Sequence, residues 1–356
     1  MRFIGCKYNI LEEIYNLSLE KGIRNGTFYD IFSGTTCVAV FFKKKGFRVI
    51  SNDLLFFSYV LQKAYIENNS TPTFRKLLKK LKLPDKNIKP LNRIIKYLDS
   101  LKGIEGFIYK NYTEEGTASG NVKRMYFQGE NGKKVDAIRI KIEEWKNLRL
   151  LSEQEYYILL SSLIEAVPFV SNISGTYGAF LKFWEHRTYN DLNLKVPEII
   201  INSHKNKALN EDGVKQCKRI KCDILYIDPP YNRRQYAPNY HILETIARYD
   251  NPHIKGVSGL RKYDELKSQF CNKESAKVAL SNIVMQGNYK HLIFSYNNEG
   301  LLSDNEIQQI LSLKGNIVEK RIVEYRRFKS HNRGINNHKR RVEELLYYVR
   351  GKLHGN

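Results

Sequence analysis

The sequence lacks a hydrophobic run long enough to cross a membrane, since no apolar stretch approaches the roughly 18 residues that a spanning helix needs. Its first residues are not expected to be a secretory signal, because the short apolar stretch there is soon followed by Glu12 and Glu13. The 5 cysteines are scattered, and Cys217 and Cys222 have no second Cys or His pair nearby at zinc-ligand spacing. These absences predict an intracellular protein with reduced thiols and no zinc site of that kind.

Acidic residues are also scarce relative to basic ones. The 356 residues include 59 Lys and Arg against 37 Asp and Glu, which gives a net charge of +22. Lysine-rich composition imposed by an AT-rich genome explains part of this excess, and the alternative is a polyanionic partner such as nucleic acid. Charge alone does not separate DNA from RNA or from an acidic membrane surface.

The first part of the chain has the pattern of an α/β unit. Apolar periodicity and β-forming runs predict alternating elements in this order: helix 8–21, strand 28–32, helix 38–45, strand 47–51 and a helix through 59–65. Small residues at 33–36 connect the first strand to its helix, and Asn52-Asp53 ends the second strand. This order predicts the opening of a doubly wound α/β sheet.

The middle of the chain, 70–195, does not continue this alternation. It is rich in lysine, has turn-forming stretches at 113–116 and 128–132, and contains one predicted helix at 153–167. Beyond it the pattern predicts further strands at 199–201, 223–227, 289–295, 317–328 and 343–349. We therefore expect 1–69 and 196–356 to form one α/β domain, with 70–195 as an inserted module.

The tetrapeptide Asp228-Pro229-Pro230-Tyr231 follows directly on the predicted strand 223–227. Two prolines cannot continue a strand ladder and stiffen the turn, and the carboxyl end of a parallel strand is where α/β enzymes place their chemistry. The Asp228 carboxylate and a proline carbonyl can both accept hydrogen bonds from an amino group, and Tyr231 offers a ring on which a base can stack. The alternative is an ordinary surface turn.

A second motif runs from Asp30 through Phe32 to Gly34. A glycine between a strand and a helix lets a ligand approach the backbone, and the helix N-terminus that follows favours a carboxylate. Asp53, at the end of the next strand, can accept hydrogen bonds from both hydroxyls of a ribose. The alternative for Asp53 is a helix N-cap.

Together these motifs bring the chain close to a known family. It resembles the DNA adenine-N6 methyltransferases of the D12 class, which include the DNA adenine methylase, in their alpha arrangement of cofactor motifs, target-recognition insert and catalytic tetrapeptide. The resemblance implies a Rossmann-like methyltransferase sheet formed by 1–69 and 196–356, with 70–195 as the target-recognition module. It also implies S-adenosyl-L-methionine as cofactor, S-adenosyl-L-homocysteine as product, and no metal.

The resemblance assigns roles to individual residues. It implies a catalytic set, Asp228, Pro229, Pro230 and Tyr231, and a cofactor-binding set, Lys7, Asp30, Phe32, Gly34 and Asp53. Lys7 follows a glycine in a motif that, in the family, reaches the methionine end of the cofactor. The chain departs from the family where the second glycine of the cofactor turn is Thr36. The polar residue that contacts the cofactor adenine is left open among Asn202, His204 and Asn206.

The DNA-binding residues are expected in two segments. One is the loop after the tetrapeptide, with Arg233, Arg234, Gln235 and Tyr236, in a polar–aromatic stretch that continues through Asn239, Tyr240 and His241. The other is the basic C-terminal segment, with Arg326, Arg327, Lys329 and Arg333. The alternatives are ordinary loop composition and a solvated basic hairpin. Parts of 126–182 are similar to one restriction–modification branch, which implies methylation of adenine in sites that contain ATG.

The expected function is methyl transfer to N6 of an adenine flipped out of duplex DNA, protecting host DNA in a restriction–modification system. Double-stranded DNA is the expected partner, together with a separate cognate endonuclease, and no membrane is expected. The expected location is the bacterial cytoplasm, in association with the nucleoid. The alternatives are an RNA or protein-amide N-methyltransferase, and an inactive DNA-binding subunit with the same fold.

Overall fold

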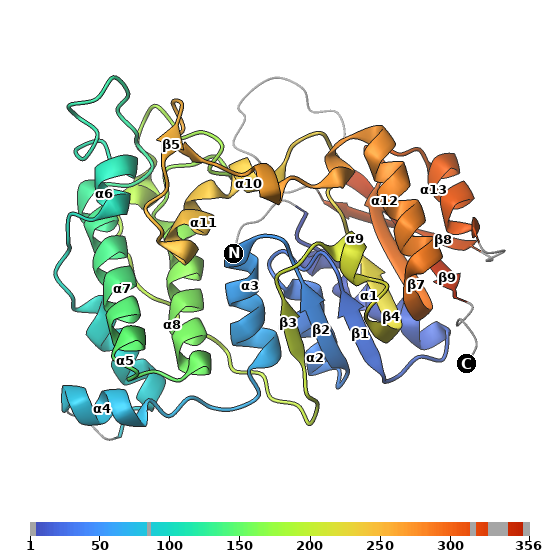
Figure 1. Ribbon diagram of the computed structural model, residues 1–356, viewed down its shortest axis with the longest axis horizontal. Helices are drawn as coiled ribbons and strands as arrows, with labels where there is room; N and C mark the ends of the chain where they lie inside the picture. The colour runs from blue at the N-terminus through green and yellow to red at the C-terminus, as the bar shows by residue number, and fades with distance from the viewer. Residues whose placement is uncertain (1–4, 84–86, 314–317, 327–340, 352–356) are drawn as a thin grey trace. The chain divides into compact units, whose positions relative to one another are not determined.

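The computed structural model describes residues 5–83, 87–313, 318–326 and 341–351 (Figure 1). The chain divides into two compact units. Among the described residues, the first unit takes its members from Lys63–Ile199 and Ala237–Asp264, and the second from Gly5–Gln62, Ile200–Tyr236 and the segment after residue 264. The predicted insert, 70–195, therefore lies inside the first unit, which also contains a segment that follows the tetrapeptide.

The second unit is built on a seven-stranded sheet, counting strands within the described ranges, in the order β3-β2-β1-β4-β7-β9-β8 (Figure 1). The strands are β1 (Thr27–Asp30), β2 (Arg48–Asn52), β3 (Lys207–Leu209), β4 (Lys221–Ile227), β7 (Asn288–Asn297), β8 (Val318–Arg326) and β9 (Arg341–Arg350). β3, β2, β1, β4 and β7 are parallel, whereas β9 pairs antiparallel with both β7 and β8. The prediction of a Rossmann-like α/β methyltransferase sheet is confirmed.

Helices connect these strands. In chain order they are η1 (Tyr8–Ile10), α1 (Leu11–Glu20), α2 (Cys37–Lys44), α3 (Phe56–Gln62), α9 (Gly213–Gln216), η6 (Gln269–Cys271), α12 (Lys273–Gln286) and α13 (Asp304–Leu311). The chain passes between the units after Gln62 and after Ile199, and again within α10 (Tyr236–Asn239) and η5 (Asp264–Leu266). The helices and strands predicted before residue 66 are all present, with bounds shifted by only a few residues.

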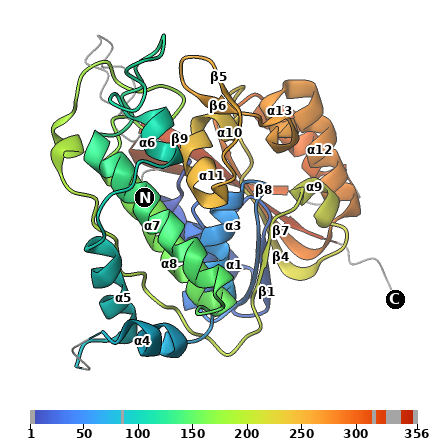
Figure 2. The same ribbon diagram turned by 60° about the vertical axis from the view of Figure 1, so that its left-hand side comes forward.

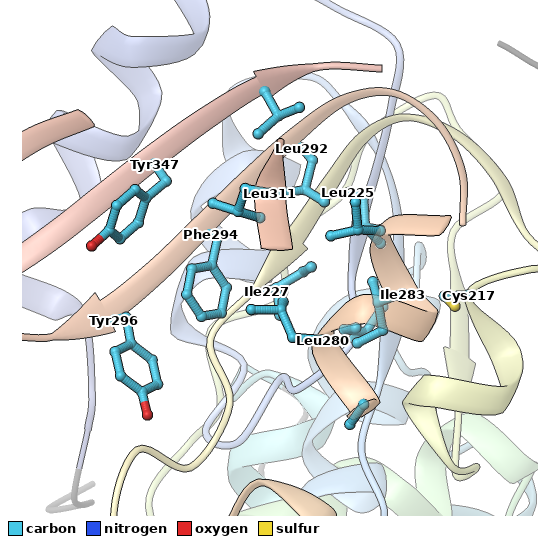
Figure 3. Close-up of a cluster of buried hydrophobic side chains, with 14 of the residues drawn as sticks. Cys217, Leu225, Ile227, Leu280, Ile283, Leu292, Phe294, Tyr296, Leu311 and Tyr347 are labelled. Carbon is cyan, nitrogen blue, oxygen red and sulfur yellow. The ribbon is translucent and has the colours of Figure 1, made fainter. Parts of the chain in front are cut away.

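Successive side chains of each central strand point to opposite faces of the sheet, and both faces are buried. On one face, alternate residues of β4 and β7 pack against α12 and α13 in a single core (Figure 3). The residues of this core labelled in Figure 3 are Cys217, Leu225, Ile227, Leu280, Ile283, Leu292, Phe294, Tyr296, Leu311 and Tyr347. On the other face, Phe28 of β1 stacks on Phe42 of α2 with ring centroids 3.7 Å apart. This two-sided burial explains why the central strands read as nearly continuous apolar runs.

The position of β3 differs from the expected one. The apolar run 199–201 has no strand structure, and the edge strand is Lys207–Leu209 instead. Asn206 supplies part of the reason, because its side-chain oxygen accepts a hydrogen bond from the Val49 backbone N–H at 2.9 Å. This bond fixes the chain beside β2 just before the ladder begins, so an apolar run alone was a poor guide to the register.

The first unit is mainly helical (Figure 2). Its elements are η2, a π-helix (Lys63–Glu67), α4 (Arg75–Leu81), α5 (Pro90–Asp99), α6 (Phe107–Tyr112), α7 (Gly129–Asn147), α8 (Glu153–Ala166), η3 (Val167–Phe169), η4 (His186–Tyr189), α11 (His241–Arg248) and the short strands β5 (Ile254–Lys255) and β6 (Leu260–Arg261). α8 lies where the sequence predicted a helix, and it begins at a capping box formed by Ser152 and Glu155.

The expected turn at 128–132 is wrong, because these residues form the first part of α7. Two glycines suggested a turn, but both have a packing role. A Cβ on Gly132 would lie 2.4 Å from Cγ2 of Thr113, and one on Gly129 would lie 2.9 Å from the Glu115 carboxyl group. The glycines therefore permit a close approach between α7 and the segment after α6, and this tertiary contact overrides their low helix propensity.

Candidate functional site

The acidic residues singled out in the sequence gather at the carboxyl ends of three neighbouring parallel strands. Asp30 is the last residue of β1, and it lies in register with Ser51 of β2 and Tyr226 of β4. Asp53 and Asp228 follow one residue after the ends of β2 and β4. The fold therefore brings the predicted cofactor turn and the predicted catalytic tetrapeptide to the same edge of the sheet.

Asp228 forms an ion pair with Lys7. The Lys7 Nζ lies 3.1 Å from Asp228 Oδ1, and the two side chains are 3% and 17% exposed. Burial raises the pKa of Asp228 to about 7, and the nearby Glu344 carboxylate also raises it, while the Lys7 ammonium opposes this change. The carboxyl group is thus poised to change its charge near neutral pH.

The rest of the tetrapeptide is held by the loop that follows β7. The Tyr231 carbonyl accepts a hydrogen bond from the Leu301 N–H at 2.9 Å, and its ring meets that of Tyr296 edge to face at 6.5 Å. Pro229 is buried, whereas Pro230 and Tyr231 are partly exposed. These contacts hold the turn in place and leave Tyr231 partly accessible.

The turn between β1 and α2 binds Asp53 through its backbone. Gly34 has φ +51°, and its N–H donates to Asp53 Oδ2 at 2.8 Å. The other carboxyl oxygen of Asp53 accepts the Leu55 N–H at 2.9 Å, which is the N-cap-like bond that was the alternative interpretation of this residue. A carboxylate oxygen has more than one lone pair, so these bonds leave Asp53 able to accept further donors.

Thr36 occupies a backbone conformation that favours glycine. Its φ is +65°, in the left-handed region, and the residue is 1% exposed. A β-branched residue is strained there. The Thr36 hydroxyl donates to the Thr35 carbonyl at 2.6 Å, which offsets part of that strain. The residue that departs from the family pattern is therefore also the strained one in the turn.

Asp30 is almost completely buried, at 1% exposure, and it accepts a hydrogen bond from the Ser33 hydroxyl at 3.1 Å. Burial raises the pKa of Asp30 to about 8, and the nearby Asp228 carboxyl raises it further. Phe32 is half-buried, with its ring 5.3 Å from that of Phe270.

The three candidates for contact with the cofactor adenine do not lie at this edge. Asn202, His204 and Asn206 all precede β3, and parallel pairing with β2 puts them at the amino ends of the strands. Their side chains bond to backbone groups around 46–49. That expectation is corrected, because it rested on the misplaced strand. The residue after β3 is Asn210, and its side chain donates to the Asp53 carbonyl at 2.8 Å.

The loop after the tetrapeptide divides into exposed and anchored residues. Arg233 and Arg234 are exposed, and no ion pair involves either of them within the described part of the chain. Gln235, by contrast, bonds to the Ser268 backbone twice, donating to its carbonyl at 3.0 Å and accepting from its N–H at 2.7 Å. The Gln235 amide therefore fixes the loop, and Tyr236 beside it is partly exposed.

The polar–aromatic stretch ends in buried residues. Tyr240 and His241 are each 1% exposed, and the His241 Nε2 is 2.9 Å from the Tyr177 carbonyl. Burial lowers the pKa of His241 to about 4. A neutral, enclosed imidazole of this kind packs the first unit, so Tyr240 and His241 have little exposed surface with which to contact DNA.

The expected C-terminal DNA contacts are described only in part. Arg326 is the last residue of β8, where its backbone lies in register with Arg341. The other three residues, Arg327, Lys329 and Arg333, lie outside the described residues. Their role in DNA binding stays a prediction.

Sequence reasoning missed Glu344. This residue of β9 is 0% exposed, and its Oε1 lies 2.7 Å from Lys7 Nζ and 2.5 Å from the Ser295 hydroxyl. The sequence carried one sign of a buried carboxylate: a second acidic residue inside the apolar strand 343–349, on the same face of the strand as Leu346. Its partner Lys7 is 337 residues away in the sequence, so the pairing could not be predicted from spacing.

Within residues 5–83, 87–313, 318–326 and 341–351, no group of three or more His, Cys, Asp or Glu side chains is placed to hold a metal ion. In the same ranges, no helix combines the length and apolar character needed to cross a membrane. All 5 cysteines are free, with Cys6 and Cys37 as the closest pair at 3.6 Å between sulfurs.

A Rossmann-like sheet that carries a partly buried carboxyl group and two prolines directly after β4 is typical of an N6-adenine methyltransferase. The family model described as D12 class N6 adenine-specific DNA methyltransferase matches residues 3–311, and the chain belongs to this family. It is 43% identical over 99% of its length to modification methylase StsI from Streptococcus sanguinis, and 44% identical over 98% to type II methyltransferase M.FokI from Planomicrobium okeanokoites. It spans 52% of each of those two relatives. It is also 37% identical to type II methyltransferase M.NlaIII from Neisseria lactamica, covering 95% of this chain and 96% of that relative.

Proposed function

We propose that this chain transfers a methyl group from S-adenosyl-L-methionine to N6 of an adenine flipped out of duplex DNA. The observation that carries the proposal is the juxtaposition of Asp228, in its stiff proline turn, with the Gly34–Asp53 turn at one edge of the sheet. Membership of the D12 class supports the same chemistry.

The residues at this edge fit the cofactor. Gly34 has no Cβ, so a ligand can approach the backbone there, and Asp53 can accept further hydrogen bonds from ribose hydroxyls. The carboxyl groups of Asp228 and Glu344 share the Lys7 ammonium, so an ionised Asp228 would leave net negative charge beside a cationic ligand. When bound, the cofactor supplies an electrophilic methyl group on its sulfonium. Phe32 and Lys7 remain proposed cofactor-binding residues.

Asp228 and the backbone of the proline turn would hold the target amino group. The adenine amino nitrogen is a poor nucleophile because its lone pair is delocalised into the ring. Asp228 Oδ1 is occupied by Lys7, which leaves Oδ2 to accept a hydrogen bond from N6, while the Pro229 carbonyl can accept the second one. The accessible part of the Tyr231 ring offers a stacking surface for the extruded base. Catalysis is then mainly positioning.

DNA binding is proposed through the exposed Arg233 and Arg234, together with Tyr236 and the basic C-terminal residues Arg326, Arg327, Lys329 and Arg333. The net charge of +22 supports a polyanionic partner. Gln235 would act by fixing this loop, since its amide already bonds to Ser268. We propose that 70–195 contributes target recognition, with an ATG-containing site as the expected target.

The proposed setting is a bacterial restriction–modification system in the cytoplasm, where a separate endonuclease cuts the same site and this chain protects it. The names of the related modification methylases support this setting. A host that expresses the chain should contain protected adenines in one short sequence context, and methylation mapping of its genomic DNA checks this expectation.

Cofactor binding and methyl transfer test the proposal separately. We expect calorimetric titration to detect S-adenosyl-L-methionine binding to the purified chain, and tritium from its methyl group to enter unmethylated duplex DNA. A chain that binds duplex DNA but neither binds the cofactor nor transfers label would instead be the inactive DNA-binding subunit. Label that enters RNA or protein and not DNA would identify a different methyl acceptor.

A further inference from the structure

Glu344 is the most enclosed carboxylate of the strand-end cluster formed by Lys7, Asp30, Asp228 and Glu344. Its side chain is 0% exposed, and one oxygen, Oε1, accepts hydrogen bonds from both the Lys7 ammonium at 2.7 Å and the Ser295 hydroxyl at 2.5 Å. β9 carries it into the sheet opposite Asn297 of β7. The contact with Lys7 is shorter than the 3.1 Å between Lys7 and Asp228.

We propose that Glu344 is a positioning residue for methyl transfer. It holds the Lys7 ammonium, so that Lys7 orients one oxygen of Asp228 while Asp228 is not the sole counter-ion of Lys7. The inference rests on the proposed function, because it assigns Glu344 a part in that reaction. Glu344 itself touches neither substrate nor cofactor in this account.

The physical reason is the sharing of one cation between two anions. A buried ammonium attracts its carboxylate strongly, since little water screens the pair. If Asp228 were the sole counter-ion of Lys7, the ion pair would stabilise the negative charge of Asp228 more strongly. Asp228 would then be a weaker hydrogen-bond acceptor for an amino group. With Glu344 as the nearer partner, Lys7 is already neutralised, and Asp228 keeps an available acceptor oxygen.

The free oxygen of Glu344 makes the residue suitable for a conservative test. Oε2 is buried and has no hydrogen-bond partner among the described residues. Replacing Glu344 with glutamine keeps the shape of the side chain and can keep the acceptor Oε1 for Lys7 and Ser295. It removes only the charge, so the variant Glu344→Gln is expected to fold.

The charge of Glu344 should be visible in the pH dependence of the reaction. The groups that face Asp228 are Lys7, Cys6, Asp30, Tyr226 and Glu344. Among them Glu344 raises the pKa of Asp228, whose value is about 7, and Lys7 lowers it. If methyl transfer requires the ionised form of Asp228, the rate falls as pH decreases through the pKa of Asp228. Removing the charge at 344 therefore moves the acidic limb to lower pH.

The experiment measures kcat against pH with unmethylated, amplified duplex DNA for four proteins: wild type, Glu344→Gln, Glu344→Asp and the control Glu343→Gln. Glu343 is the neighbouring residue of the same strand, and its side chain bonds to Asn298 instead. For Glu344→Gln we expect kcat at pH 8 to fall about 10- to 100-fold and the acidic limb to move down by about one pH unit. Glu344→Asp should recover part of both changes, and Glu343→Gln should match the wild type.

A uniform loss of rate in Glu344→Gln with an unmoved acidic limb would overturn the proposal, because a purely structural role predicts that result. A wild-type rate in this variant would overturn it as well. Titration of ¹³C-labelled aspartate carboxyl groups by NMR gives a readout that does not need activity. An unchanged pKa of Asp228 in Glu344→Gln contradicts the inference, whereas an inactive wild type contradicts the proposed function instead.

Discussion

Two groups of buried charged residues, one in each unit, have different partners. In the first unit, two buried residues of α7 satisfy backbone groups at helix ends: Asp136 accepts the N–H groups of Ile108 and Tyr109 at 2.9 and 2.8 Å, and Arg139, besides its ion pair with Glu143, donates to the carbonyls of Ile246 and Ala247. In the second unit the buried charges at the strand ends face one another. Lys7 contacts two carboxylates, and Asp30 lies beside Asp228.

This difference separates two uses of buried charge. A charge that satisfies backbone groups at the end of a helix stabilises the fold, and its loss leaves those groups without partners. Charged side chains that are one another's partners are costly to bury, and they place titratable groups where chemistry is expected. Neutral substitutions in the cluster around Lys7 should therefore preserve the fold and lower the activity. A neutral substitution of Asp136 in the first unit should instead lower the stability.

The largest expected effect is on activity, at Asp228. Replacing it with alanine removes the acceptor for the amino group, so we expect methyl transfer to fall by about 10³-fold or more. DNA binding, measured by fluorescence anisotropy at fixed salt, should change by less than about threefold, because Asp228 makes no phosphate contact in this account. Equal losses of transfer and binding would instead make Asp228 a structural residue.

The next effect is on stability, at Asp136. Its carboxylate receives two N–H groups at the start of α6 and the Tyr249 hydroxyl at 2.6 Å. An asparagine side chain at this position would present an NH₂ group to one of these donors, so Asp136→Asn should lower the free energy of unfolding by about 3 kcal/mol in urea. The control Glu144→Gln, on the exposed side of the same helix, should stay within about 0.5 kcal/mol of the wild type. Similar values for the two variants would contradict the comparison.

Neutralising Asp30 should increase the stability, in contrast to the loss expected at Asp136. Its pKa is about 8 in the folded protein, raised mainly by burial, against about 3.9 in an unfolded chain, so the folded state binds the proton more tightly. Stability is therefore lost as pH rises from about 4 to about 8. Asp30→Asn cannot ionise, and it should gain stability relative to the wild type by on the order of 2 kcal/mol more at pH 8.5 than at pH 5. Urea unfolding at the two pH values measures this, and a pH-independent difference would exclude the burial argument.

The smallest effect is expected at Thr36. Alanine is normally more stable than glycine, by about 1 kcal/mol within a helix. At φ +65° the order should invert, so Thr36→Gly should unfold at a higher urea concentration than Thr36→Ala. Ser161, inside α8, serves as the control position where alanine should exceed glycine. The usual order at both positions would show that the turn relaxes without strain.

Much of the second unit could be predicted from sequence because its rules are local. Apolar runs bounded by small residues located β1, β2, β4 and β7, and parallel topology then required Asp30, Asp53 and Asp228 to meet at one edge. The strand at 207–209 was missed, since three residues are too few to show an apolar pattern and its place depends on Asn206.

The remaining differences depend on contacts between distant residues. Gly129 and Gly132 look like turn residues until Thr113 and the following segment are packed against α7. The role of Glu344 depends on Lys7, at the other end of the chain, and only the antiparallel insertion of β9 beside β7 brings them together. Such pairings follow from the fold, and no local pattern encodes them.

The most direct measurement is the identity of the methylated nucleoside. Amplified duplex DNA is incubated with tritiated S-adenosyl-L-methionine and either the wild type or Asp228→Ala, then digested to nucleosides and separated by chromatography. We expect label from the wild-type reaction to elute with N6-methyldeoxyadenosine, and Asp228→Ala to give about 10³-fold less label there. Label in a methylated cytosine, or equal labelling of adenine by the two proteins, would contradict this expectation.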